Sequence, residues 1–240
     1  MASVRILVQR RTNERGDIMI SLQGLPQVIT AIGGLGTAAF GLVDASKVLW
    51  GGVNHFGFRR IKRTVTSLTP GNPANALSQD KIIATLKANW FNGTDLATQK
   101  SIAKSLIKLN LDATNGAALA ATTGVDPTIL TAVATSIKAG TALTTAQSDV
   151  YARFDLIVTA LLDETYQRAD NVYRNWTRGI AAAVAVALAI VGGQTLNPRL
   201  DTLQSVIVGL LATPLAPIAK DLSTALATAV NTMQLMKKMG

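Results

Sequence analysis

Two uncharged runs near the carboxyl end decide the fold: Gly-Ile-Ala-Ala-Ala-Val-Ala-Val-Ala-Leu-Ala-Ile-Val-Gly-Gly at Gly179–Gly193, and Leu203–Ala219 after a polar turn that contains Pro198. A bilayer core needs about 20 residues of apolar helix, so each run is slightly short, and Trp176 and Leu200 extend them. Two such runs joined by a turn are typical of a membrane helical hairpin. The alternative is a buried hairpin in a soluble helical protein, because runs of this length also occur as core helices.

The composition favours the membrane interpretation. Of 240 residues, 48% are apolar and only 15% are charged, and the mean hydropathy is +0.30. A net charge of +9 fits either nucleic acid or an anionic membrane surface. Because the cations gather at the ends of apolar runs, we expect a lipid bilayer as the partner and no nucleic acid. There is no cysteine, which excludes disulfides and thiolate metal sites.

A third candidate span lies near the amino end, where residues 25–43 carry no charge. Small residues recur there at steps of four: Gly33, Thr37, Gly41 and Ala45. Such a stripe lets another membrane helix approach closely, so we expect it to pack against a helix. The alternative is simple tolerance of glycine in membrane helices.

The same stretch contains a G-x-G-x-x-A motif that begins at Gly34. A dinucleotide-binding fold also requires an acidic residue about 20 positions later and an alternation of strands and helices, which this chain lacks. We therefore expect no cofactor.

Four cations follow the first span: Arg59, Arg60, Lys62 and Arg63. By the positive-inside rule they predict a basic anchor at the cytoplasmic membrane surface.

Residues 78–144 predict a small domain of short helices. Apolar residues between Ile82 and Phe91 form one amphipathic set, and those between Leu96 and Leu109 form a second. Asp126 followed by Pro127 predicts the start of a third helix, because Asp caps helices and Pro fits their first turn. We expect the lysines of the second set to be solvated: Lys100, Lys104 and Lys108.

One long helix is predicted from Ala146 to Trp176, and it should continue into the apolar run at Gly179 without a break. Three aromatic residues near this entry predict an interfacial belt: Tyr166, Tyr173 and Trp176. The carboxylates of Asp163, Glu164 and Asp170 lack a nearby His or Cys. We expect them to pair with Arg168 and Arg174 rather than to bind a metal.

The predicted organisation has five parts: a polar arm at 1–22, a first span at 23–58, a cytoplasmic helical domain at 59–145, a long helix at 146–178 and a membrane hairpin at 179–236. Residues 1–22 hold no apolar run before a cleavage site, so we expect no cleaved signal. With three spans, nine cations near the membrane share the side of the helical domain: Arg59, Arg60, Lys62, Arg63, Arg168, Arg174, Arg178, Lys237 and Lys238. Five lie on the other side: Arg5, Arg10, Arg11, Arg15 and Arg199. This difference places the helical domain in the cytoplasm.

The layout resembles a group of uncharacterised bacterial inner-membrane proteins. The matching residues are Arg153-Phe154-Asp155, the segment Tyr173–Arg178, the segment Val184–Leu188, and Ala216-Pro217 followed by Asp221-Leu222. The resemblance implies one N-terminal span, a basic stretch, a cytoplasmic helical region and a long helix that enters a C-terminal hairpin. It implies a bacterial inner-membrane location and carries no activity with it.

Together these features predict an all-α integral membrane protein with about three transmembrane helices and a small cytoplasmic helical domain. We expect a non-enzymatic structural or assembly subunit that forms a homo-oligomer or docks in a larger membrane complex. The alternative is an ion or small-solute channel or carrier that uses four intramembrane charges: Asp44, Lys47, Lys220 and Asp221. Asp44 and Lys220 fall at similar depths in their spans and are expected to pair. The alternatives are that Asp44 pairs with Lys47 on its own helix, or that Lys220 extends to the lipid headgroups. A third hypothesis is a soluble or peripheral enzyme with a glycine-rich loop at Gly34.

Overall fold

The computed structural model describes residues 28–48, 51–70, 77–195 and 199–217, and within these ranges it contains helices and no strand. The chain divides into two compact units. Residues 46–176 form the first, which we call the helical domain. The second, which we call the apolar unit, combines the described residues of 1–45 with those of 177–240. The all-helical class predicted from the sequence is confirmed.

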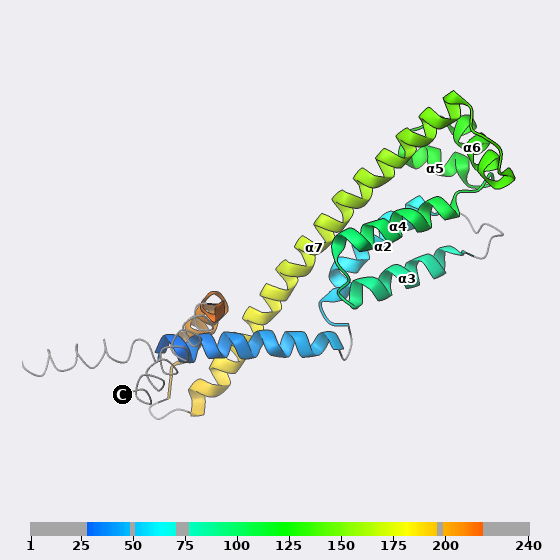
Figure 1. The fold of residues 1–240 in the computed structure, drawn as a ribbon. Coiled ribbons are helices and arrows are strands. Elements are labelled where there is room, and N and C mark those ends of the chain that lie inside the picture. The colour runs from blue at the N-terminus through cyan, green and yellow to red at the C-terminus, as the bar shows by residue number, and fades with distance from the viewer. Residues whose placement is uncertain (1–27, 49–50, 71–76, 196–198, 218–240) are drawn as a thin grey trace, which may run out of the picture. The chain divides into compact units, whose positions relative to one another are not determined.

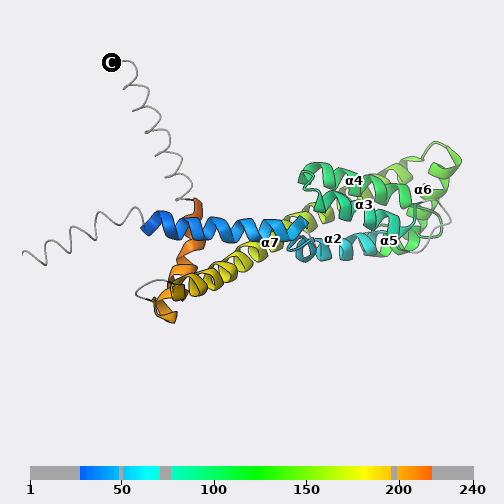
Figure 2. The same ribbon diagram turned by 90° about the horizontal axis from the view of Figure 1, so that it is seen from below.

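The helical domain is built from five short helices and the first part of a long one. They are α2 (Asn54–Leu68), α3 (Gln79–Phe91), α4 (Leu96–Asn110), α5 (Gly116–Thr123), α6 (Pro127–Ala139) and α7 (Thr145–Thr195), the last as far as Trp176. The short helices α5 and α6 lie near the start of α7, whereas α2, α3 and α4 lie further along it (Figure 1). A second view shows the same arrangement (Figure 2).

Local capping sets several of these boundaries. The Asp126 carboxylate accepts the backbone N–H of Ile129 at 2.8 Å, and Pro127 occupies the first turn of α6, as predicted. Asp95 caps α4 in the same way through Thr98. At the other end of α6, Gly140 adopts a left-handed conformation with φ of 68°, which a side chain would disfavour.

Large apolar side chains fill the core of the helical domain. Phe154, Leu162 and Tyr166 of α7 are buried. They pack with residues from the shorter helices that are also buried: Ile61, Leu68, Ile82, Leu86, Ile107, Leu119 and Leu130. Burial of such side chains away from water is the usual source of stability for a compact helical domain.

Helix α7 runs for 51 residues without interruption, about 77 Å at the rise of an α-helix. Its continuity confirms the predicted long helix. Ion pairs join it to α4: Lys100 to Asp163 at 2.6 Å, and Lys104 and Lys108 to Asp155 at 2.6 and 3.0 Å. The prediction that these lysines form a solvated face is therefore wrong, because they face carboxylates of α7.

The apolar unit contains the helix Val28–Val48 as far as Ala45, the end of α7 from Thr177, and the helix Thr202–Pro217. The helix Val28–Val48 and α7 are long and apolar enough to cross a membrane, whereas Thr202–Pro217 is shorter. Twelve described residues of this unit are buried, and eleven of them are Gly, Ala or Ser: Gly33, Gly36, Ala39, Ala181, Ala185, Ala189, Gly193, Ser205, Gly209, Ala212 and Ala216. The twelfth is Val43. The interior of this unit is thus made almost wholly of small residues.

One sequence expectation for the first helix needs correction. The expected stripe is only partly the packed one: Gly33 is buried, but Thr37, Gly41 and Ala45 are exposed. The close approach to the helix Thr202–Pro217 is made by Gly36 instead. The G-x-G-x-x-A motif at Gly34 lies inside the helix and not in a loop, so the structure shows no glycine-rich loop at this position.

The structure also divides the chain at a different point from the sequence. The predicted first span, 23–58, contains the whole helix Val28–Val48 and the start of α2. The boundary between the two units falls after Ala45, so the basic segment belongs to a helix of the helical domain.

Candidate functional site

The basic segment after the first span forms one exposed face of α2. Phe58, Ile61 and Val65 point into the core at helical spacing. The four cations occupy intervening positions, and all are exposed: Arg59, Arg60, Lys62 and Arg63. No acidic residue occurs in α2. We call these four residues the basic face.

A stacked aromatic pair borders the basic face. The rings of Phe56 and Trp176 lie 4.3 Å apart and nearly parallel, at 8°. Trp176 is 48% exposed, as an interfacial aromatic residue would be. Tyr166, which the sequence placed in the same belt, is only 1% exposed and lies in the core of the helical domain. Burial raises the pKa of its phenol above the ordinary value. The prediction for Tyr166 is therefore wrong.

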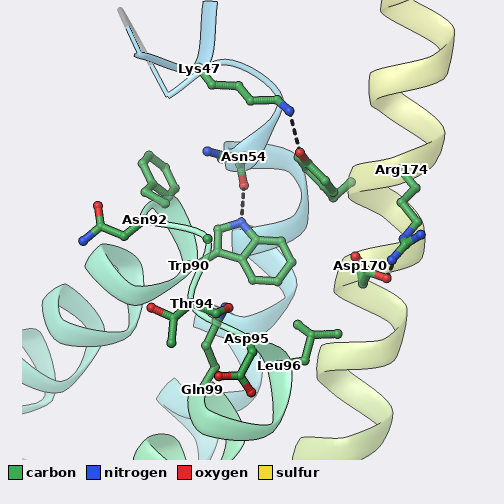
Figure 3. Close-up of a pocket in the computed structure, with 13 residues that line it drawn as sticks. Lys47, Asn54, Trp90, Asn92, Thr94, Asp95, Leu96, Gln99, Asp170 and Arg174 are labelled. Carbon is green, nitrogen blue, oxygen red and sulfur yellow. Dashed lines mark hydrogen bonds and ion pairs between the residues drawn. The ribbon is translucent and has the colours of Figure 1, made fainter. Parts of the chain in front are cut away.

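A hollow of about 360 Å³ lies between the α3–α4 turn and α7 (Figure 3). Trp90 lines it, and its indole N–H donates to the backbone carbonyl of Asn54 at 3.0 Å. Asp170 and Arg174 line the α7 side and form an ion pair at 2.7 Å. Gln99 lies at the base and donates through its side-chain nitrogen to the Thr94 carbonyl at 2.5 Å.

The charged groups around this hollow each hold a structural contact. Asp95 caps α4, and its hydrogen bonds with Thr98 lower the pKa of the carboxyl. Lys47 donates to the Tyr173 hydroxyl, and Asp170 binds Arg174. Among the described residues, no group of three or more His, Cys, Asp or Glu side chains is arranged to hold a metal ion. The geometry favours a structural role for the hollow.

The structure places only some of the predicted intramembrane charges. Lys47 belongs to the helical domain, where its ammonium donates to the Tyr173 hydroxyl at 2.6 Å and lies 5.0 Å from the ring centroid. Asp44 belongs to the apolar unit and is exposed. Lys220 and Asp221 lie outside the described residues, so the expected pair of Asp44 with Lys220 stays a prediction.

The acidic residues of α7 follow the sequence expectation in part. Glu164 pairs with Arg168 at 2.6 Å and Asp170 pairs with Arg174, as predicted. Asp163 instead binds Lys100. Asp155, for which no pairing was predicted from the sequence, binds both Lys104 and Lys108 of α4.

No protein-family model, curated protein or solved structure matches this chain.

Proposed function

We propose that the chain is a non-catalytic membrane subunit whose apolar unit is embedded in a lipid bilayer and whose helical domain is exposed to the cytoplasm. One observation carries the proposal: the two units differ in the size of the apolar residues that they bury. The helical domain buries large side chains such as Phe154 and Leu86. The apolar unit buries alanine and glycine and exposes its large residues: Val28, Leu42, Val191, Leu203, Ile207, Leu210 and Leu211.

The surrounding solvent explains this difference. In water, large apolar side chains are buried in the protein core, and an extended exposed apolar surface promotes aggregation. In a bilayer there is no such driving force between helices, since lipid tails are as apolar as leucine. Small residues then favour close helix packing while large ones face lipid. The apolar unit fits the second case.

The packing of the apolar unit supports the same view. A Cβ atom at Gly209 would collide with the backbone of Val186 on α7, and one at Gly36 would collide with the backbone of Ala212. Ala39, Ala185 and Ala212 form a shared cluster. We infer three membrane helices, with the helix Thr202–Pro217 as the third. The small residues Thr37, Gly41 and Ala45 are exposed, and we propose that they contact a second copy of the chain or another subunit. This contact is the assembly role that we propose.

Carbonate extraction of a membrane fraction tests the embedding. We expect the protein to stay in the pellet with an integral marker, and its release with a peripheral marker would contradict the proposal. A matched pair of variants sharpens the test. Leu210 and Leu156 are 55% and 69% exposed, in the apolar unit and the helical domain respectively.

Leu210→Arg should reduce membrane insertion, because Arg at the centre of a membrane helix costs about 2.5–3.5 kcal/mol. Leu156→Arg should have little effect, since its side chain faces water. Equal tolerance of both variants would show that water surrounds both units.

A further inference from the structure

The four cations of the basic face have no carboxylate partner within the described structure, whereas six other cations of the helical domain do. Lys100, Lys104, Lys108, Lys138, Arg168 and Arg174 each form an ion pair with Asp or Glu. None of these pairs involves a residue of the basic face. Its charge is thus left for a partner outside the domain.

The charge balance of the helical domain leads to the same conclusion. Residues 46–176 contain fourteen Lys and Arg against nine Asp and Glu. Without the basic face, ten cations would face nine acids. Nearly all of the excess positive charge of the domain is therefore gathered on α2, within five consecutive positions.

The position of the basic face relative to the aromatic pair suggests the partner. Phe56, Arg60 and Thr64 are spaced four apart and share one side of α2. On this side, Phe56 stacks on Trp176 and the Thr64 hydroxyl binds that of Thr165 at 3.0 Å. Trp176 in turn precedes the apolar run at Gly179 by three residues. The four cations lie three to seven residues beyond Phe56, about 4.5–10.5 Å along the helix axis.

We propose that the basic face, with Phe56 and Trp176, binds the headgroups of anionic phospholipids such as phosphatidylglycerol; this inference rests on the proposed membrane location. Arginine binds phosphate oxygens through two parallel N–H donors, and tryptophan settles at the level of the headgroups. The spacing along α2 brings the long cationic side chains within a Debye length of the headgroup level. At that distance an anionic membrane surface attracts them.

The test uses the full chain in neutral detergent micelles and follows its binding of fluorescent phosphatidylglycerol by anisotropy, with phosphatidylcholine as the neutral comparison. We expect the protein to prefer phosphatidylglycerol. Removing two cations with Arg59→Gln and Arg63→Gln should weaken that binding by about 25-fold at low salt. The matched control removes the same charge elsewhere, with Lys87→Gln and Arg153→Gln, both at exposed positions. It should keep nearly full affinity.

Several results would overturn the proposal. The first is that the wild-type protein binds phosphatidylglycerol and phosphatidylcholine equally well. The second is an equal loss of affinity in the control variant, which would indicate an effect of net charge alone. The third is displacement of the lipid by a single-stranded oligonucleotide at equal charge concentration. Circular dichroism melting checks that the variants fold, and Arg60→Gln with Lys62→Gln provides a second pair on the same face. The lipid preference is measured in micelles, without a bilayer, so its result does not depend on the result of carbonate extraction. Release by carbonate would defeat the proposed function, whereas retention without lipid preference would defeat only this inference.

Discussion

Gly36 of the first helix lies against the backbone carbonyl of Ala212, so close that even a Cβ atom would collide with it. The clash is with main chain, which cannot rotate away as a flexible side chain can. The contact therefore fixes how near these two helices of the apolar unit come.

Gly36→Leu should consequently destabilise the protein by about 1–3 kcal/mol or more, through overpacking. Gly41→Leu is the matched control, because no atom lies within 4 Å of the Cβ position at Gly41. Thermal melting in detergent should show a lower midpoint for Gly36→Leu only. Size-exclusion chromatography with light scattering should show a smaller assembly for Gly41→Leu if the exposed stripe joins subunits. An unchanged melting curve for Gly36→Leu would contradict the packing described.

Asp155 should make the stability of the helical domain depend on acidic pH. Burial opposes ionisation of this carboxyl, but its hydrogen bonds and charge interactions with Lys104 and Lys108 outweigh that effect and lower the pKa. A pKa that is lower in the folded state stabilises the protein above the unfolded value of about 4. That contribution is lost as the pH falls through the folded value.

Asp155→Asn should therefore cost about 1–2 kcal/mol at pH 7, and the difference from wild type should shrink below about pH 3. Asp149→Asn is the control, since Asp149 is exposed and forms no ion pair in the described part of α7. Melting curves at pH 7, 5 and 3 measure the effect. A constant difference at all three values would exclude the ion pairs as its cause.

The parts of the fold that follow from local chemistry were predictable. Asp126 and Pro127 start α6 because capping and the restricted φ of proline act within four residues. The buried positions of α3 follow from helical periodicity. In α4 the same rule failed in part, because Leu109 of the predicted set is exposed and Gln99 and Ala103 are buried instead. The ion pairs of α4 with α7 were not predictable, because Lys104 and Asp155 are 51 positions apart and only the tertiary arrangement brings them together.

The packed side of the first helix shows a second limit. Two sets of small residues share that helix, and their spacing alone does not say which one faces a neighbour. The structure turns Gly36 and Ala39 inward and Gly41 outward. The neighbouring surfaces decide this: Ala185 and Ala212 pack with Ala39 in one cluster. The four cations of the basic face were identified from the sequence. That they lack carboxylate partners in the described structure was not predictable, because it depends on where the acidic residues of α7 lie.

Gly57 should tolerate no side chain. A Cβ atom there would lie 2.5 Å from the Trp90 ring and 2.9 Å from the Ala169 carbonyl oxygen. Gly57→Ala is expected to destabilise the helical domain by about 1–3 kcal/mol. Gly179→Ala, at a helical position with open space, should instead be neutral or stabilising by up to about 1 kcal/mol. Melting midpoints compare the two, and a loss of similar size in both would argue against the close packing of α2 on α7.

Lys47 distinguishes the structural hypothesis from the carrier alternative. Its ammonium donates to the Tyr173 hydroxyl at 2.6 Å in a partly buried position, and a charged hydrogen bond of this kind contributes about 1.5–3 kcal/mol. Tyr173→Phe keeps the ring under the cation but removes the acceptor, so it should lower the melting midpoint. Lys47→Met should lower it further, because the cation–π contact is also lost.

In liposomes containing the full chain, both variants should leave ion flux at the level of protein-free vesicles, as the wild-type protein should. The carrier alternative predicts the opposite pattern. A lysine that lines an ion path would change the flux when replaced by methionine and would have little effect on melting. If Lys47→Met melts like wild type and alters a measurable flux, the channel or carrier hypothesis replaces the structural one.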